Sequence, residues 1–310
     1  MKKVVIRTDP DTRHWWKETM TGLLPGYEMY LWDEDNFDHN EISYVITWAP
    51  PPGMIASLPN VKCVFSVGAG VAHITKDPTF PRSVPIVRTI GEPLRQRMRE
   101  YVALHVLRIH RRLPALEAAV RNQQWKWFVE PIASQIRVGI MGVGNLGTAA
   151  AFTLKGLGYP VRGLSRRGRQ VDGFEVFSRE QFAEFLDGVM IVVSILPGTA
   201  ENENIINAEM INRLPRGAWI INAGVGNQVN EADLIAALDS GHLAGAVLDV
   251  FRKEPLPLDN PLWKHPKVLI TCHTAAAIEP AVGGEIIANN LLAFDRGERV
   301  PDIVDIDQGY

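Results

Sequence analysis

The chain has 310 residues, 46% of them hydrophobic and 22% charged, the composition of an ordinary globular protein with one large core or two smaller ones. A formal net charge of −3 gives no reason to expect nucleic acid or an anionic membrane as a partner, and no apolar run approaches the ~20 residues that span a bilayer. Two cysteines, Cys63 and Cys272, are too few for a disulfide framework. No signal-peptide core follows the first residues, so we expect a cytoplasmic protein.

Short apolar segments alternate with longer helical ones along almost the whole chain, as in a parallel sheet covered by helices. In the first hundred residues, the expected strands are 4–7, 28–32, 44–47, 61–67 and 86–88. This pattern predicts an α/β fold.

The hydrophobic period changes after residue 100. Apolar residues then recur at intervals of three and four and mark one face of a long helix: Val102, Val106, Ile109, Leu113, Leu116 and Val120. Pro114 should kink this helix or divide it in two, because proline removes a backbone donor and crowds the preceding turn. A loop at 123–134, rich in aromatic residues, follows.

The most informative segment is an apolar strand at 138–141 that leads into a G-x-G-x-x-G turn and a helix of small residues. In a dinucleotide-binding turn, Gly142 permits the bend, Gly144 lets the backbone approach a pyrophosphate, and Gly147 lets helix and sheet pack closely. The N-terminus of the helix then offers N–H groups and the positive end of a dipole to the phosphates. The weaker alternative is a plain strand-to-helix connection.

The next expected strand, 159–165, ends in the sequence Ser165-Arg166-Arg167. An NAD-binding unit should place an acidic residue there, about 20 positions beyond the glycines, to hold the ribose 2′-hydroxyl. No carboxylate stands at this strand end in the sequence, and Arg166 or Arg167 can pair bidentately with a 2′-phosphate. We therefore predict NADPH rather than NADH as the cofactor; the alternative is a solvated basic loop.

Further strands are expected at 189–196, 218–222, 244–248 and 268–271, and an amphipathic helix at 285–296. The position of this last helix suggests that the chain returns to pack on the first domain. We therefore expect a nucleotide-binding domain at 101–280, inserted into a smaller domain made of 1–100 and 281–310.

Several segments match one family in order and spacing: Ser-Ile-Leu-Pro-Gly-Thr at 194–199, Ile-Ile-Asn-Ala-Gly at 220–224, 245–251, Glu-Pro-Leu-Pro at 254–257 and Thr-Cys-His at 271–273. With these motifs the chain resembles the D-isomer-specific 2-hydroxyacid dehydrogenases, and within them the NADPH-dependent glyoxylate/hydroxypyruvate reductases. The resemblance implies two doubly wound parallel-sheet domains, a Rossmann nucleotide domain inserted into a flavodoxin-like substrate domain, and a homodimer. It also implies an oxidoreductase that reduces a small 2-oxo acid to the 2-hydroxy acid by hydride transfer from NADPH.

The resemblance also assigns catalytic roles. His273 would be the acid that protonates the carbonyl oxygen, and imidazole suits this task because its ordinary pKa of ~6.5 lets it hold and release a proton near neutrality. Glu254 would hydrogen-bond the other ring nitrogen, fix the tautomer and raise the pKa of the ring. Asp249 would hold the nicotinamide carboxamide or order the cleft, with a helix N-cap as the alternative.

The predicted cofactor-binding residues are Gly142, Gly144, Asn145, Leu146, Gly147, Ser165, Arg166, Arg167, Leu196, Pro197, Asn222, Ala223, Gly224, Asp249 and His273. The predicted substrate-binding residues are Trp48, Gly68, Ala69 and Gly70, a turn that would offer backbone N–H groups to the substrate carboxylate. The alternatives are core packing for the tryptophan and a simple strand-ending turn for 68–70. We predict no metal site.

Val225 stands where the family normally has an arginine that grips the substrate's carboxylate and carbonyl oxygens. Loss of such a contact to a developing oxyanion typically costs about 10²–10³ in rate. In one hypothesis the chain is a reductase with weak activity or an altered substrate, and Arg95, Arg97 and Arg99 either supply a replacement charge or form a solvated helix start. In the other, it binds NADPH with little catalysis and acts as a regulatory or binding module. Cys272 replaces a usual proline and is expected to be a small buried hydrophobe rather than a nucleophile.

Overall fold

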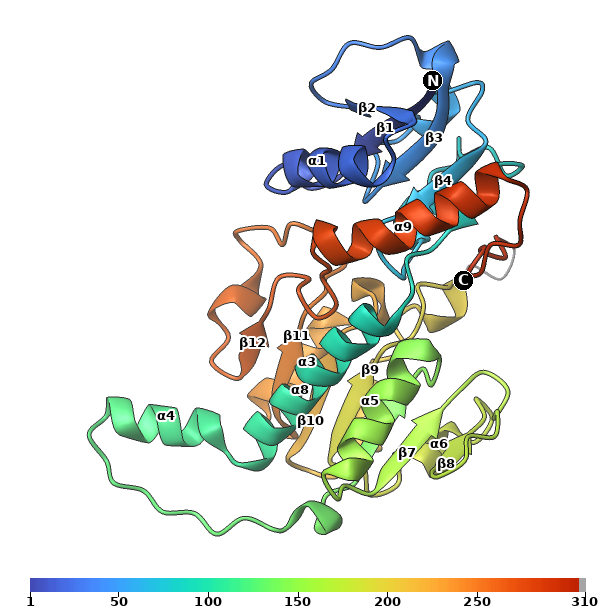
Figure 1. Ribbon diagram of the computed structural model, residues 1–310. Helices are drawn as coiled ribbons and strands as arrows, with labels where there is room; N and C mark the ends of the chain where they lie inside the picture. Colours follow the sequence, from blue (N-terminus) through green and yellow to red (C-terminus); the bar gives the residue numbers. More distant parts are fainter. Residues whose placement is uncertain (307–310) are drawn as a thin grey trace. The chain divides into compact units, whose positions relative to one another are not determined.

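The computed structural model of the chain describes residues 1–306, which form two compact units. Unit 1 consists of Met1–Leu94 together with the chain from Ala277 onward, and unit 2 consists of Arg95–Ala276. Each unit is built on its own parallel sheet with helices around it (Figure 1). The expected fold class, two doubly wound α/β domains of which one is inserted into the other, is confirmed.

Unit 1 has a five-stranded sheet in the order β2-β1-β3-β4-β5, with every neighbouring pair parallel. This 2-1-3-4-5 order is that of the flavodoxin-like folds. Its strands are β1 (Lys2–Arg7), β2 (Tyr27–Leu31), β3 (Ile42–Thr47), β4 (Cys63–Ser66) and β5 (Ile86–Val87), and its helices are α1 (Arg13–Leu23), α2 (Ala72–Thr75) and α9 (Pro280–Asp295). All five strands expected in the first hundred residues are present, with ends shifted by a few residues.

Helix α9 completes the core of unit 1, although more than 180 residues of sequence separate it from β5. Trp16 and Met20 of α1 share one hydrophobic cluster with Ile287 and Leu291 of α9. A Cβ atom added at Gly284 would come within 2.9 Å of Thr19, so this glycine allows the two helices to approach closely. The expected return of the last helix to the first part of the chain is therefore observed.

Unit 2 has a seven-stranded sheet in the order β12-β11-β10-β9-β6-β7-β8, again with every pair parallel. The strands are β6 (Val138–Met141), β7 (Val161–Leu164), β8 (Glu175–Phe177), β9 (Ile191–Ser194), β10 (Ala218–Asn222), β11 (Leu243–Leu248) and β12 (Val268–Ile270). The order reverses between β6 and β9, which is the topological switch point at which doubly wound sheets bind ligands. Strand β8 was not expected from the sequence.

Helices cover both faces of this sheet. Helices α3 (Glu92–His110) and α5 (Asn145–Gly156) contribute to the hydrophobic cluster on one face. Helices α6 (Phe182–Leu186), α7 (Ala208–Asn212) and α8 (Glu231–Asp239) contribute to the cluster on the other. Across residues 1–306, no helix combines the length and the apolar character needed to cross a membrane.

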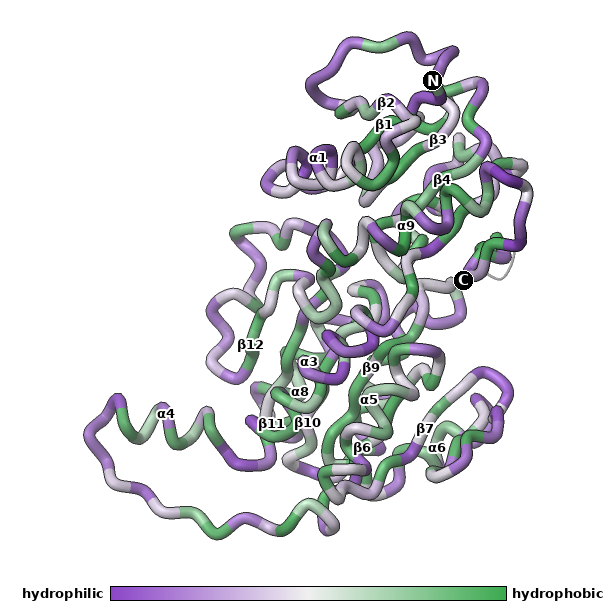
Figure 2. The backbone as a smooth tube through the Cα atoms, viewed as in Figure 1, coloured by the Kyte–Doolittle hydropathy of each residue, from purple (hydrophilic) through white to green (hydrophobic). Residues whose placement is uncertain are grey.

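The long helix expected after residue 100 is divided, as Pro114 indicated. Helix α3 ends at His110, Arg112 adopts a left-handed φ of 51°, and α4 (Leu113–Arg121) starts with the proline in its first turn. The apolar face that these residues mark is not buried along its whole length, because Val120 is 73% exposed. Helix α4 and the extended segment 122–132 form an arm, on which Figure 2 shows hydrophobic positions among hydrophilic ones.

Candidate active site

The predicted cofactor-binding and catalytic residues of unit 2 lie at one edge of its sheet. They belong to the segments that directly follow β12, β11, β10, β9, β6 and β7, which are consecutive neighbours in the sheet. Because the strands are parallel, their carboxyl ends meet at the same edge. Along this edge His273 follows β12 at one side and Arg166 follows β7 at the other.

The glycine-rich turn gives its three glycines three different surroundings. Gly142 has a φ of +95°, and a Cβ atom there would lie 2.7 Å from the Ile195 carbonyl oxygen. A Cβ atom at Gly147 would lie 2.0 Å from the carbonyl oxygen of Gly142. Gly144 is exposed, has a φ of −76°, and an added Cβ would meet nothing within 4 Å. Internal packing therefore explains the first and third glycines but not Gly144, whose lack of a side chain leaves the N-terminus of α5 open to a ligand.

A row of close contacts connects the glycine turn to the histidine side of the edge. Gly142 lies against the backbone of Leu196, and Gly224 lies against the same leucine. The main-chain N–H of Asp249 donates to the carbonyl oxygen of Asn222 at 3.0 Å, and that of His273 donates to the carbonyl oxygen of Asp249 at 2.6 Å. The structure therefore brings the predicted residues of five loops together.

Gln228 also lies at this edge, although it was not among the residues predicted for the site. Its side chain is fully buried, accepts a hydrogen bond from the Ser194 hydroxyl at 2.7 Å, and donates to the carbonyl oxygen of Leu196 at 2.7 Å. It thereby ties the segment after β9 to the segment after β10. Asn222 has a similar internal role, because its amide donates to the Val225 carbonyl oxygen and accepts from the N–H of Gly224.

The basic pair after β7 is exposed, and its surroundings correct one statement made from the sequence. Arg166 lies 3.3 Å from a carboxylate oxygen of Glu201, which comes from the segment after β9. The sequence interpretation that no carboxylate stands beside this pair is therefore wrong in three dimensions. Arg179 holds the turn that carries this carboxylate, donating to the Glu201 carbonyl oxygen at 2.5 Å and to the Asn202 side chain at 2.7 Å.

His273 and Glu254 form an ion-pair contact, with Nδ1 of the ring 2.6 Å from Oε2 of the carboxylate. Partial burial of the ring opposes its charged form. The hydrogen bond that the ring donates to Glu254 and the charge of that carboxylate, with a smaller contribution from Asp249, outweigh burial and raise the pKa of His273. The carboxylate also accepts from the N–H of Phe251 at 2.8 Å, which fixes its position. The pair can therefore hold a proton on the imidazole at a higher pH than a free histidine.

Asp249 orders the loop that carries the histidine. It is 1% exposed, and its carboxylate accepts from the Thr271 hydroxyl at 2.6 Å and from the N–H groups of Thr274 and Ala275 at 2.8 and 2.9 Å. Tyr101 of α3 lies 2.8 Å from the Thr271 hydroxyl and extends this network. Asp249 therefore positions His273 through the backbone of the segment after β12.

Cys272 is exposed, which corrects the expectation of a buried hydrophobe. Both Cys272 and His273 adopt left-handed conformations, with φ angles of 50° and 60°. Left-handed backbone is unfavourable for residues with side chains, and it persists where surrounding contacts enforce it. The hydrogen bonds to Asp249 supply that enforcement and turn residue 272 outward.

Val225 occupies an extended position just before a short 3₁₀ turn, with a φ of −137°. The neighbouring Gly226 is packed so tightly that an added Cβ would lie 1.8 Å from the Phe251 carbonyl carbon. The backbone around residue 225 is therefore fixed by contacts that do not depend on the side chain at that position.

In unit 1, the structure brings together two of the predicted substrate-binding positions. The indole of Trp48 lies over Gly68, where a Cβ atom would come within 2.7 Å of the ring, and the ring of His73 lies 4.1 Å from that of Trp48 between centroids. Within residues 1–306, the N–H groups of Ala69 and Gly70 have no hydrogen-bond acceptor. The turn is thus able to offer these N–H groups to an anionic group.

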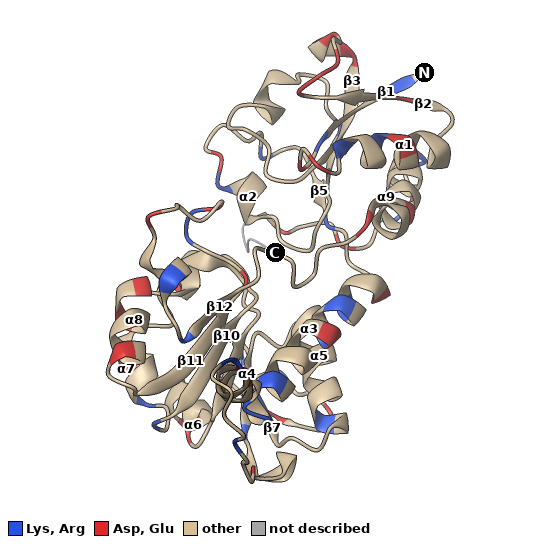
Figure 3. Cartoon of the chain, turned by 90° about the vertical axis from the view of Figure 1, so that its left-hand side faces the viewer, with Lys and Arg blue, Asp and Glu red and all other residues tan. Residues whose placement is uncertain are grey.

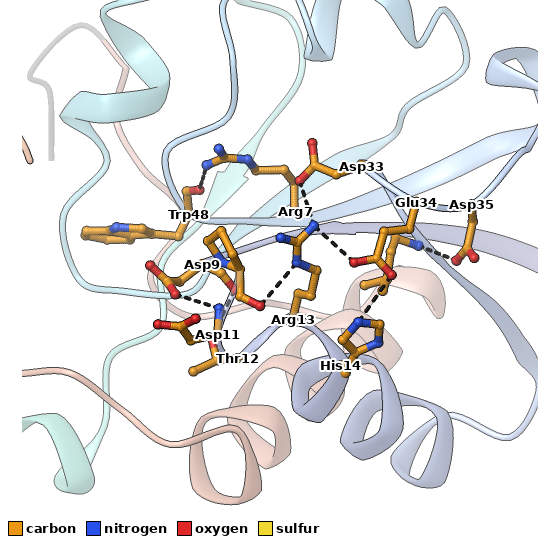
Figure 4. A network of polar contacts seen from close by, with 12 residues as sticks. Arg7, Asp9, Asp11, Thr12, Arg13, His14, Asp33, Glu34, Asp35 and Trp48 are labelled. Atoms are coloured by element: carbon orange, nitrogen blue, oxygen red, sulfur yellow. Dashed lines mark hydrogen bonds and ion pairs between the residues drawn. The ribbon is translucent and has the colours of Figure 1, made fainter.

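Arg7, at the end of β1, fixes the tryptophan and was not expected from the sequence. Its guanidinium donates to the carbonyl oxygen of Trp48 at 2.9 Å and also to that of Ala49, whose φ of 46° is left-handed. Figure 4 shows Arg7 reaching toward Trp48, and beside it a second cluster in which Arg13 of α1 pairs with Glu34 at 3.1 Å. These contacts hold the segments after β1, β2 and β3 at one edge of the unit 1 sheet.

Comparison with known families and proteins adds to this geometry. The sequence profile of the family described as "D-isomer specific 2-hydroxyacid dehydrogenase, NAD binding domain" matches residues 103–275. Over 302 residues the chain is 38% identical to a glyoxylate/hydroxypyruvate reductase A of Salmonella paratyphi B, with 96% of each chain covered.

Solved structures show the same similarity. A D-isomer specific 2-hydroxyacid dehydrogenase from Xanthobacter autotrophicus Py2, crystallised with NADPH and MES, has 38% identity and a TM-score of 0.92 over 100% of this chain and 99% of its own. An NADPH-dependent glyoxylate/hydroxypyruvate reductase from Sinorhizobium meliloti, crystallised with NADP and sulfate, has 33% identity and a TM-score of 0.93 over 100% of both chains.

Proposed function

This chain belongs to the D-isomer specific 2-hydroxyacid dehydrogenase family, as its motifs indicated, and from this premise we propose that it reduces a small 2-oxo acid of the glyoxylate or hydroxypyruvate type with NADPH. The observation that carries the proposal is the His273–Glu254 pair, at 2.6 Å, on the same sheet edge as the glycine turn. A protein that only stored a dinucleotide would have no use for a histidine whose pKa is raised by a neighbouring carboxylate.

The residues of unit 2 fit a phosphorylated dinucleotide. The exposed Gly144 leaves the N-terminus of α5 open to a pyrophosphate, which the dipole and free N–H groups of a helix start favour. Arg166 and Arg167 follow β7, where a 2′-phosphate would lie. The similar Xanthobacter and Sinorhizobium proteins were crystallised with NADPH and NADP. When bound, the cofactor would supply the hydride. We accordingly assign cofactor binding to unit 2 and substrate binding to unit 1.

His273 would act on the substrate's carbonyl, and a separate group would hold its carboxylate. Nδ1 of His273 donates to Glu254, so the proton for the carbonyl oxygen would leave from Nε2. Glu254 stabilises the charged ring before transfer and keeps Nδ1–H in place afterwards. The N–H groups of Ala69 and Gly70, next to Trp48 and Gly68, would receive the substrate's carboxylate.

The direct test follows NADPH absorbance with glyoxylate or hydroxypyruvate, for wild type and for His273→Ala. We expect slow wild-type turnover, because Val225 cannot polarise the carbonyl, and near-complete loss in the variant. If wild type binds NADPH but reduces no 2-oxo acid, the chain is a binding or regulatory module instead.

We also propose a homodimer formed through the arm of unit 2. Trp125 is 100% exposed, Trp127 81% and Val129 75%, and three large apolar side chains this exposed within five residues are unusual on a surface that stays in water. Sedimentation of wild type and of Trp125→Ser/Trp127→Ser tests this: the variant should sediment as a monomer, whereas a monomeric wild type would refute the dimer.

A further inference from the structure

Arg95 of α3 lies against the glycine turn, although 50 residues of sequence separate the two. Its Nη1 atom donates to Oδ1 of Asn145 at 3.2 Å. Asn145 is the first residue of α5, directly after the exposed Gly144. Figure 3 shows cationic positions on α3 close to α5. The contact therefore places a guanidinium beside the start of the helix that would face a dinucleotide.

The glycine turn itself lacks a cation. Residues 142–147 contain neither lysine nor arginine, so the turn offers a pyrophosphate only N–H groups and the dipole of α5. That dipole is equivalent to roughly half a positive charge, whereas a pyrophosphate diester carries two negative ones. An arginine at the helix start supplies the missing charge, and its five N–H donors can serve Asn145 and a phosphate oxygen at once.

We propose that Arg95 is a pyrophosphate-binding residue, a role that rests on the proposed function of unit 2 as a dinucleotide-binding unit. The side chain of Asn145 holds the guanidinium at the turn, and Gly144 leaves the space above the turn open. Arg95 therefore serves the part of the cofactor that NADPH and NADH share. Arg166, after the neighbouring strand β7, serves the 2′-phosphate that only NADPH has.

This assignment differs from the hypothesis that Arg95 replaces the substrate-gripping arginine that Val225 lacks. A substrate-binding arginine would change KM for the oxo acid and leave the affinity for cofactor intact. A pyrophosphate-binding arginine changes the affinity for every dinucleotide, including fragments without nicotinamide. The two roles therefore separate in binding measurements made without substrate.

The test is calorimetric titration of the full chain with NADPH, NADH and ADP-ribose. We expect Arg95→Ala to raise Kd about tenfold for all three ligands, as loss of a charge-assisted hydrogen bond does, and Arg95→Lys to raise it less. Arg166→Ala should raise Kd for NADPH alone. Arg97→Ala is the matched control, because this exposed arginine lies two residues along α3 and faces away from its neighbour.

Three results would overturn the assignment. Unchanged Kd values in a folded Arg95→Ala protein would show that the guanidinium does not reach the cofactor. A loss confined to NADPH would place Arg95 at the 2′-phosphate, and a change in KM for the oxo acid alone would place it at the substrate. If wild type binds none of the three ligands, both the proposed function and the role of Arg95 are refuted. If wild type binds them and Arg95→Ala leaves every Kd unchanged, only the role of Arg95 is refuted and the proposed function stands.

Discussion

Nδ1 of His273 lies 2.6 Å from Oε2 of Glu254, on a loop whose backbone Asp249 holds. A raised pKa means that the protonated, folded form is favoured up to a higher pH than for a free histidine. The pair therefore stabilises the fold fully below the ordinary pKa of histidine, and this contribution is lost as pH rises through the raised pKa.

Glu254→Gln should shift the pH dependence of reduction. The amide still accepts a hydrogen bond but carries no charge, so the pKa of His273 falls and the ring loses its proton at lower pH. We expect kcat/KM for oxo-acid reduction to decline at lower pH than in wild type. The matched control is Glu209→Gln, which removes an exposed carboxylate paired with Arg213. An unmoved profile would mean that His273 is not the titrating acid.

Val225→Arg should raise the rate of 2-oxo acid reduction. The backbone at this position is fixed by Asn222 and Gly226, so an arginine can be placed there without rebuilding the loop. We expect a gain in kcat/KM of at least about tenfold, because one charge-assisted contact to the developing oxyanion is restored. Val225→Leu controls for added bulk. A slower arginine variant would indicate a site adapted to another carbonyl compound.

Gly144→Ala should separate folding from cofactor binding. Alanine tolerates a φ of −76°, and its methyl group meets nothing within 4 Å, so the melting temperature should stay within a few degrees of wild type. The same methyl group would occupy the approach of a pyrophosphate, and we expect Kd for NADPH to rise by about tenfold or more. Gly147→Ala gives the contrast, since its methyl group would clash with the Gly142 carbonyl oxygen and should lower the melting temperature. Unimpaired NADPH binding by Gly144→Ala would refute the proposed phosphate position.

Asp295→Asn should lower the free energy of unfolding at neutral pH, and the loss should shrink as the pH falls. Burial opposes the charge of this carboxylate, but hydrogen bonds from Lys2, from Tyr27 at 2.6 Å and from Tyr44 at 2.5 Å lower its pKa to about 2. Its contribution is present above the ordinary aspartate pKa and is lost as pH falls through about 2. We expect the variant to lose roughly 1–2 kcal/mol in the free energy of unfolding at pH 7.

Urea unfolding at pH 7 and near pH 2.5 checks this, and the difference between wild type and Asp295→Asn should narrow at the lower pH. Glu298→Gln is the control, because this exposed carboxylate pairs with the nearby, equally exposed Arg296 and its loss should change stability little. A difference that does not depend on pH would show that the charge of Asp295 is irrelevant.

The local sequence was sufficient to predict those helices and strands whose structure depends on their own residues. The strands of both sheets are buried apolar runs, and Pro114 ended one helix and started another because its ring acts on the preceding turn. Strand β8 was not predicted because it has only three residues, too few to show an apolar pattern in the sequence. It lies at the edge of the sheet and pairs with β7.

Contacts between distant segments were beyond the reach of local patterns. The carboxylate of Glu201 is 35 positions from Arg166 in the sequence, yet the neighbouring loops bring them to 3.3 Å. Gln228 and Arg7 act on the backbone of other segments, and nothing in their own surroundings in the sequence distinguishes them from surface residues. The left-handed backbone at Cys272 depends on a buried aspartate in another loop, so its exposure could not be predicted from residue type.

The place of α9 has a consequence for the order in which the protein takes shape during synthesis. A ribosome completes every strand of unit 2 before it adds the residues that cover Trp16 and Met20 of α1. The apolar surface of unit 1 that α9 covers therefore stays exposed to solvent while unit 2 is synthesised and folds. Newly made chains are most exposed to chaperones and to aggregation during that interval.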